Sequence, residues 1–351
     1  MFETLIRTVS AAYAPNGPCA LLPANMEDMD RIALMNSIQA PPDQYGGMLQ
    51  FWEATFLPKY RCTPVLILVA DGRARGGDLE GVLQLYTEAL HLVSPPGDPE
   101  FHKFVLEFTC QCEVRREENS KAWSLMKPSE PWTSVRSMDF PTELEPALIY
   151  NDFSLWSSAS PETRRRYEIF SSLQTNIMEG VFKLPAEVIE CLVNLNSIEP
   201  DEITQISFDS ATQDVLEIAD VLADTMKAFA FINDLNNCDS SRIDRKMVLD
   251  VHQLVLTTSG CLLTQTSSFS QSLQYHPGSV SRSSSKTNVY IQGCGGSIVQ
   301  FCPFEKVDEE LDLLINLYHR YEELHHSRPF AQAAWLHMVL ITCHPFTDGN
   351  G

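Results

Sequence analysis

Residues 329–343, PFAQAAWLHMVLITC, restrict what this chain can fold into more than any other stretch. They contain no Asp, Glu, Lys or Arg and would present apolar side chains all round a helix. Such a helix is typically buried, so we expect it at the centre of its domain. Pro345 cannot continue the helix and favours an extended backbone at the preceding residue. His344 is therefore expected in an extended conformation at the C-terminal end of this buried helix.

Composition and charge exclude several classes of protein. The 351 residues suffice for two domains, and 44% hydrophobic with 20% charged residues is ordinary for a globular protein. A net charge of −21 argues against binding to nucleic acid or to an anionic membrane. The chain lacks an apolar run long enough for a bilayer and a convincing signal peptide. Its ten cysteines show no metal-binding spacing, so we expect reduced thiols and a location in the cytoplasm or the nucleus.

Helical signals dominate the second half of the chain. Ser160 is a good N-cap, Pro161 suits the first helical position, and the periodic pattern that follows ends at Gly180. Apolar residues recur at helical spacing in four further stretches, 185–195, 211–231, 242–257 and 307–324. A fold of the mainly α class is therefore expected.

A β-hairpin is predicted between these helices. NVYIQ and SIVQF alternate and are rich in β-branched and aromatic residues, and the GCGG between them matches no nucleotide-binding fingerprint. The two strands are expected to contain Val289, Tyr290, Ile291, Ile298 and Val299. The polar, serine-rich stretch 264–286 before the hairpin is expected to be an exposed loop.

The first 155 residues reveal little about their role. Residues 79–92 have the apolar spacing of an amphipathic helix, and four prolines between Lys127 and Pro146 indicate a linker. We therefore divide the chain into a helical N-terminal region, 1–155, and a second domain, 156–351.

The residues after the apolar helix, HPFTDGNG, combine a base, a carboxylate and glycines. The imidazole of His344 can accept a proton near neutral pH, and Asp348 offers the kind of hard oxygen that holds Mg²⁺ beside nucleotide phosphates. Gly349, Asn350 and Gly351 could turn the chain so that their N–H groups form an anion-binding nest. The combination predicts phosphoryl or nucleotidyl transfer. The alternative is a helix end followed by an ordinary turn.

On these residues the chain resembles the Fic family, whose signature is HPFx[DE]GNGR followed by a second arginine. PFAQAAWLHMVLITC is similar to the helix that leads into that motif, and NVYIQGCGGSIVQF is similar to the family's flap. Gly278 and Arg282 loosely resemble a glycine and an arginine found before the flap. The resemblance covers the chain from about residue 160, and it implies a Fic-like helical core with a β-hairpin flap.

The resemblance implies a protein adenylyltransferase that moves AMP from Mg-ATP to a Ser, Thr or Tyr hydroxyl of a target protein. His344 would then be the general base and Asp348 would hold Mg²⁺. Gly349, Asn350 and Gly351 would bind the α- and β-phosphates of ATP. The flap would hold the target by adding its backbone as a strand. The identity of the target and the formation of a homo-oligomer are left open.

The stretch TNIMEG, from Thr175 to Gly180, resembles the inhibitory motif [ST]xxxE[GN] of one class of the family. Thr175 and Glu179 share a helix face, and the helix dipole disfavours a glutamate in the last turn. The resemblance implies that Glu179 pairs with the second motif arginine and blocks productive placement of ATP. The alternative is an exposed acidic residue near a helix end.

The sequence ends at Gly351, before either motif arginine and before the helix that would carry them. We interpret it as truncated within the motif and expect the chain as written to bind ATP poorly and to transfer AMP slowly or not at all. Two other functions remain open. One is removal of AMP from modified proteins at the same site, and the other is a non-catalytic adaptor whose N-terminal lobe binds a partner.

Overall fold

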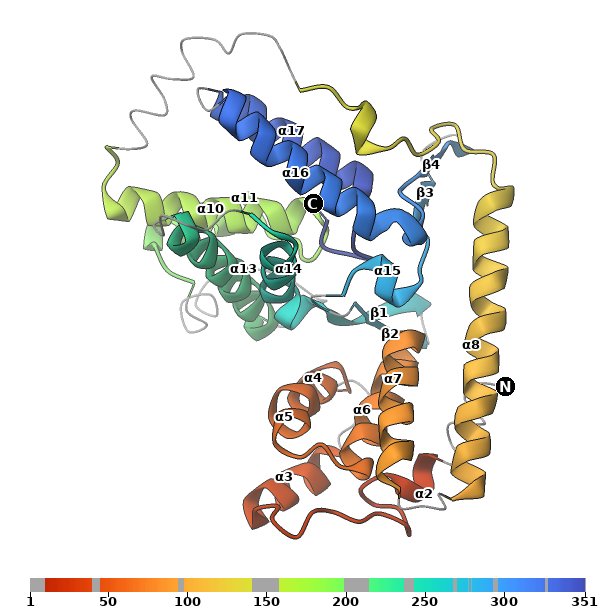
Figure 1. The fold of residues 1–351 in the computed structure, drawn as a ribbon. Helices are drawn as coiled ribbons and strands as arrows, with labels where there is room; N and C mark the ends of the chain where they lie inside the picture. The colour runs from red at the N-terminus through yellow and green to blue at the C-terminus, as the bar shows by residue number, and fades with distance from the viewer. Residues whose placement is uncertain are drawn as a thin grey trace. The chain divides into compact units, whose positions relative to one another are not determined.

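The computed structural model describes residues 10–39, 45–93, 98–140, 158–198, 215–236, 243–267, 270–276, 278, 280–292, 296–325 and 328–350. Within these residues the fold is mainly helical, and β structure is limited to two antiparallel two-stranded hairpins (Figure 1). The predicted fold class, mainly α with a β-hairpin, is therefore confirmed. None of the helices in this part of the chain is both long and apolar enough to cross a membrane.

Contacts along the chain define two compact units. The first contains Met1–Met126, Gly260–Pro277 and Ser284–Thr287, and the second contains Lys127–Ser259, Gly278–Ser283 and Asn288–Gly351. The predicted boundary between residues 155 and 156 lies outside the described residues. The candidate site residues that the structure describes all fall in the second unit.

Helices make up the N-terminal part of the first unit. In chain order they are α2 (Ala11–Tyr13), α3 (Asp28–Ser37), α4 (Tyr45–Phe51), the π-helix η3 (Trp52–Phe56), α5 (Leu57–Lys59), α6 (Thr63–Gly76), α7 (Leu79–Leu92) and α8 (Pro99–Leu125). Gly77 ends α6 with a φ of 88°, and the Asp78 carboxylate caps α7 by accepting a hydrogen bond from Gly81 N at 3.1 Å. α7 is the amphipathic helix predicted for residues 79–92.

A buried carboxylate links α6, α7 and the start of the described chain. Tyr86 Oη donates to Asp71 Oδ1 at 2.5 Å, and Ser10 Oγ donates to Asp71 Oδ2 at 3.0 Å. Burial raises the pKa of Asp71 to about 6, because the loss of hydration outweighs the two hydrogen bonds that stabilise the charged form.

The serine-rich stretch contains a hairpin where a loop was expected. β1 (Cys261–Ser267) pairs with β2 (Ser270–Tyr275), and His276 N closes the base by donating to Gly260 O at 2.7 Å. The loop prediction is wrong for these residues because backbone pairing satisfies a strand whatever its side chains, and a polar sequence weakens the signal without preventing the pairing.

Three helices of the second unit, α10 (Pro161–Met178), α11 (Ala186–Leu195) and α13 (Val215–Asn236), share one hydrophobic cluster. α10 begins as predicted, because Ser160 Oγ accepts a hydrogen bond from Thr163 N at 3.1 Å. α14 (Arg245–Ser259) lies beside α13 (Figure 1), where the Asp224 carboxylate accepts from Thr258 N at 2.9 Å.

The apolar helix of the opening prediction is α17 (Pro329–Cys343), which lies beside α16 (Val307–His325) in a second cluster (Figure 1). Trp335, Val339 and Cys343 are fully buried there. The opposite face of α17 is exposed at Phe330, Ala333, Ala334, His337 and Met338. The expectation of a helix buried on all sides is thus wrong for the described residues, because α16 and the short 3₁₀ helix η4 (Val135–Ser137) cover only one side.

Part of the expected linker is packed on the second unit, and we name residues 127–140 the strap. Ser129 N and Glu130 N donate to Ile298 O at 3.0 and 3.2 Å, and Gln300 N donates to Glu130 O at 3.1 Å. Residues 129 and 130 of the strap therefore form one parallel bridge with the strand β4 (Ile298–Gln300) at Val299.

The strap is also anchored to α16. The buried Glu310 carboxylate accepts hydrogen bonds from Ser134 Oγ at 2.7 Å and from Val135 N at 2.9 Å. Val135 and Phe140 are buried in the cluster of α16 and α17. Proline content alone indicated a linker, but backbone and side-chain hydrogen bonds hold residues 129–135 on β4 and α16.

Candidate active site

The predicted flap is present as a hairpin of β3 (Tyr290–Gln292) and β4. Ile291 lies opposite Val299, and Gly296 has a φ of 81° at the end of the turn. Tyr290 is 41% exposed and Ile291 is 50% exposed. Residues 293–295 of the turn lie outside the described residues.

α17 ends at His344 in a left-handed conformation, with a φ of 49° and a ψ of 61°. His344 N donates to Leu340 O at 2.7 Å, so this residue closes the last turn of the helix. The expectation of an extended backbone at His344 is wrong. The preference set by Pro345 is local and small, and hydrogen bonds to the carbonyls of this turn from elsewhere in the unit override it.

Those hydrogen bonds come from Arg282, the first residue of α15 (Arg282–Ser285), whose side chain is fully buried. Its Nε donates to His344 O at 2.5 Å, and its Nη2 donates to Cys343 O at 3.2 Å and to Cys302 O at 2.7 Å. Its backbone N donates to Pro345 O at 2.7 Å. Burial lowers the pKa of Arg282 to about 10, which leaves a cation at neutral pH.

The His344 imidazole is stacked on Phe301, with ring centroids 3.9 Å apart and an interplanar angle of 15°. The pKa of His344 is lowered from 6.5 to about 4, first because burial disfavours the charged ring and second because the Arg282 cation lies nearby. The Ile341 carbonyl and the Asp348 carboxylate act in the opposite direction. The ring is therefore neutral at pH 7 and able to accept a proton.

The turn after Pro345 is held by its own polar groups. Asn350 is buried, its Oδ1 accepts from Phe346 N at 2.9 Å, and its Nδ2 donates to Phe346 O at 3.0 Å. Phe346 is 2% exposed and anchors the turn in the interior of the unit. Asp348 is exposed, and its Oδ1 accepts from Gly349 N at 2.8 Å. The carboxylate and this amide therefore face the same space.

His252 of α14 packs against the inner side of this turn. Its ring lies flat on Phe346, with centroids 3.6 Å apart and an interplanar angle of 8°. Its Nε2 lies 2.9 Å from Asp348 O. A side chain at Gly349 would meet this ring, because a Cβ there would lie 3.3 Å from His252 Nε2, and Gly349 has a φ of 69°. Only glycine fits such an approach without strain.

The predicted inhibitory segment forms the end of α10. Glu179 is the C-cap of the helix and is exposed, and its N donates to Thr175 O at 3.0 Å. Gly180 follows with a φ of 74°. Among the described residues no hydrogen bond or ion pair joins the Glu179 carboxylate to the turn of His344 and Asp348.

The structure thus brings together His344, Asp348, Gly349 and Asn350, while Gly351 lies outside the described residues. Sequence reasoning missed Phe301 and His252, which lie 43 and 92 positions before His344 (344 − 301 and 344 − 252). Their contacts with the turn carry no short-range pattern. For His252 the available signal was a single histidine on the buried face of α14, where a polar side chain is usually hydrogen-bonded.

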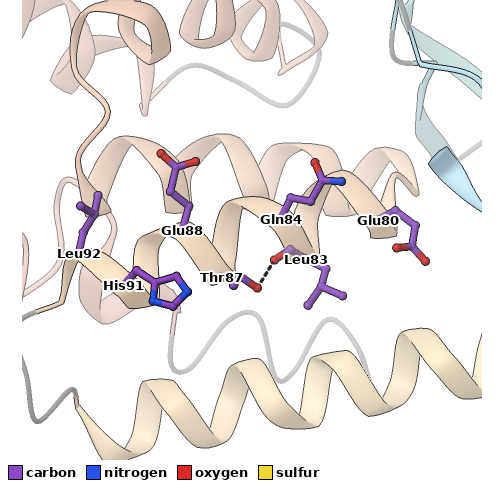
Figure 2. Close-up of a pocket in the computed structure, with 7 residues that line it drawn as sticks. All are labelled: Glu80, Leu83, Gln84, Thr87, Glu88, His91 and Leu92. Carbon is purple, nitrogen blue, oxygen red and sulfur yellow. Dashed lines mark hydrogen bonds between the residues drawn. The ribbon is translucent and has the colours of Figure 1, made fainter.

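Metal ligands do not cluster in the part of the chain that the structure describes. No group of three or more His, Cys, Asp or Glu side chains there could hold a metal ion. Figure 2 shows a shallow hollow along α7, lined by Glu80, Leu83, Gln84, Thr87, Glu88, His91 and Leu92. Its residues belong to the first unit and include none of the predicted site.

Comparisons with known proteins give one family match. The model of the Fic/DOC family matches residues 242–351. No curated protein matches the chain. Among solved structures the chain is similar to a fragment of Fic-1 from C. elegans, with 15% identity, a TM-score of 0.31, and coverage of 91% of this chain and 77% of that one. An overall likeness this weak supports no functional conclusion, whereas the family match spans α14, the flap, α17 and the turn.

Proposed function

Since residues 242–351 identify this chain as a Fic-domain protein, of a family that generally carries out AMP transfer or related nucleotidyl transfer, we propose that it is a protein adenylyltransferase. The proposed reaction moves AMP from Mg-ATP to a Ser, Thr or Tyr hydroxyl of a target protein. The observation that carries the proposal is that the neutral His344 imidazole and the exposed Asp348 carboxylate lie on one turn. The buried Arg282 holds this turn in place.

His344 is proposed as the general base. A hydroxyl oxygen of the target attacks the α-phosphorus of ATP, the bond to the bridging oxygen breaks, pyrophosphate leaves, and the imidazole takes the hydroxyl proton. A pKa of about 4 keeps the ring unprotonated at neutral pH, so it is always ready to accept that proton. The same low pKa makes it a modest base, so positioning of the two reactants has to supply much of the rate.

Asp348 is proposed as the Mg²⁺ ligand, and the residues present fit that ion. Its carboxylate is an exposed hard oxygen donor on a fixed turn, and a single carboxylate with phosphates and water is a usual way of holding Mg²⁺. Mg²⁺ would supply neutralisation of phosphate charge during transfer. Gly349, Asn350 and Gly351 are proposed to bind the phosphates. The Gly349 N–H is within reach of any anion held beside Asp348, since the two groups share one space.

The flap is proposed to hold the target as an added strand, through Val289, Tyr290, Ile291, Ile298 and Val299. Phe301 N donates to Val289 O at 3.4 Å, and the antiparallel alternation then points the backbone groups of Tyr290 and Gln292 away from β4. The outer edge of β4 already pairs with the strap. The open edge of β3 is therefore the proposed docking edge.

Glu179 is proposed to restrain the reaction, with Thr175 and Gly180 shaping the helix end that presents it. The support is the sequence pattern and the exposed position of the carboxylate at the end of α10. In the proposed role, Glu179→Gly raises transfer of labelled AMP onto the protein itself, whereas Glu187→Gly, an exposed change in the next helix, does not. Equal rates of AMP transfer by Glu179→Gly and by the unaltered protein would show that Glu179 does not restrain the reaction.

The proposed function is tested with protein expressed from its full coding sequence. Incubation with Mg²⁺ and ATP labelled at the α-phosphate should attach label to protein, and His344→Ala should abolish it. ATP labelled at the γ-phosphate should attach none, which separates adenylyl transfer from phosphoryl transfer. An AMP-modified protein incubated without ATP tests the reverse activity. Label that survives His344→Ala would overturn the assignment of the base.

A further inference from the structure

His252 controls the direction in which one peptide group of the catalytic turn points. Its Nε2 lies 2.9 Å from the Asp348 carbonyl, which can only accept, so Nε2 carries the proton and donates. The ring is 4% exposed and is stacked on Phe346, so it has a fixed plane from which to donate.

The peptide group between Asp348 and Gly349 links this hydrogen bond to the proposed nucleotide side. In a trans peptide the C=O and the N–H of the following residue point in opposite directions. With the carbonyl directed at His252, the Gly349 N–H must point the other way. There it meets the Asp348 carboxylate at 2.8 Å. The Asp348 carbonyl that accepts from His252 and the Gly349 N–H on the other side therefore belong to one rigid peptide plane.

Glycine makes this peptide group easy to reverse. Gly349 adopts a φ of 69° and carries no side chain that would oppose rotation of the peptide plane. The hydrogen bond from His252 to the Asp348 carbonyl favours one of the two orientations. The Leu256 side chain, which also lies beside Gly349, is apolar and forms no hydrogen bond that could fix the orientation of this peptide group.

We propose that His252 is a positioning residue for nucleotide binding, because its Nε2–H fixes the Asp348–Gly349 peptide with the Gly349 N–H facing the phosphates. This inference rests on the proposed function for its nucleotide, but the orientation of the peptide is a property of the protein alone. His252 is buried behind the turn, and its hydrogen bond reaches the nucleotide side through Asp348 and Gly349.

Two variants separate the hydrogen bond from the stacking. His252→Phe keeps a flat ring on Phe346 and removes the donor, and His252→Gln keeps an N–H donor at a similar reach and removes the ring. His252→Phe should raise KM for Mg-ATP roughly tenfold with little change in kcat, which corresponds to one lost hydrogen bond at the site. His252→Gln should recover most of the loss.

A packing control comes from the same helix. Leu256→Val trims a second side chain that lies beside Gly349 and leaves His252 in place. It should lower the melting temperature about as much as His252→Phe does, without the rise in KM. If Leu256→Val raises KM for Mg-ATP as much as His252→Phe, general packing explains the effect and the positioning role is overturned.

A second measurement needs no nucleotide. Hydrogen exchange of the Gly349 amide, followed by NMR in the ligand-free protein, should quicken at least fivefold in His252→Phe and stay near the original rate in His252→Gln. If the unaltered protein transfers no AMP, the proposed function fails and the exchange rate alone decides the inference. If the exchange rate of the Gly349 amide is unchanged in His252→Phe, the positioning role of His252 is overturned, whether or not the protein transfers AMP.

Discussion

Phe301 covers one face of the His344 imidazole, with the two ring centroids 3.9 Å apart and the planes 15° from parallel. Phe301 directly follows β4, and its backbone N donates to Val289 O, so the hairpin and the His344 ring are connected through one aromatic residue. Phe301 therefore shields one face of the His344 ring from water.

Phe301→Leu should raise the pKa of His344 from about 4 towards its ordinary 6.5, because a smaller side chain lets water reach the ring. The unfolded state binds more protons than the folded state between these two pH values, so the unaltered protein loses stability as the pH falls from about 6.5 to 4. The variant should lose less across that window. NMR titration of the His344 ring measures the shift, and Phe140→Leu, in the cluster of α16 and α17, is the control.

Arg282→Met should destabilise the second unit by about 3 kcal/mol, because the carbonyls of Cys302, Cys343 and His344 would lose their shared donor while remaining buried. Arg282→Lys keeps the charge and can satisfy only part of the set, so its loss should be smaller. Urea unfolding at pH 7 measures both. A methionine variant as stable as the unaltered protein would contradict the structural role of the guanidinium.

Asp71→Asn should flatten the pH dependence of stability in the first unit. The folded state binds the Asp71 proton more tightly than the unfolded state, so the contribution of this group falls as the pH rises from about 4 to about 6. Asparagine has no proton to lose over that range. Urea midpoints of the variant and the unaltered protein, measured at pH 4, 5, 6 and 7, should differ by an amount that changes with pH. The control is Asp28→Asn, a change at an exposed residue of α3, for which no such pH-dependent difference is expected.

Tyr290→Pro should reduce modification of a protein target while leaving the hairpin intact, because it removes a backbone N–H from the open edge of β3 and none from the pairing with β4. Tyr290→Ala keeps that N–H and serves as the matched control. Label transferred from ATP to a target mixture measures the effect. Equal transfer by the two variants would show that this edge is not used.

The sequence predicted the mainly α class, the start of α10, the amphipathic α7 and the flap, because each depends on periodicity and capping within a few residues. It did not predict the conformation of His344. That conformation follows from Arg282, whose contacts with residues 343–345 join segments about sixty positions apart. The exposed face of α17 was missed for a related reason, since a uniformly apolar helix does not reveal which sides its neighbours cover.

The strap was hidden from sequence reasoning because its prolines and polar residues indicate a linker. Its structure depends on partners elsewhere in the second unit: the β4 edge receives its backbone, and Glu310 receives Ser134 and Val135. Extended segments that pair only through the backbone leave almost no side-chain pattern.

The placement of the strap has a practical consequence for anyone dividing this protein for expression. A recombinant fragment that starts at residue 156 would leave β4 as a bare edge, on which strands of neighbouring molecules could assemble. It would also remove the two donors of the Glu310 carboxylate, Ser134 and Val135. A fragment that starts at Lys127 retains both partners, and comparing the aggregation of the two fragments would show how much the second unit depends on those few residues.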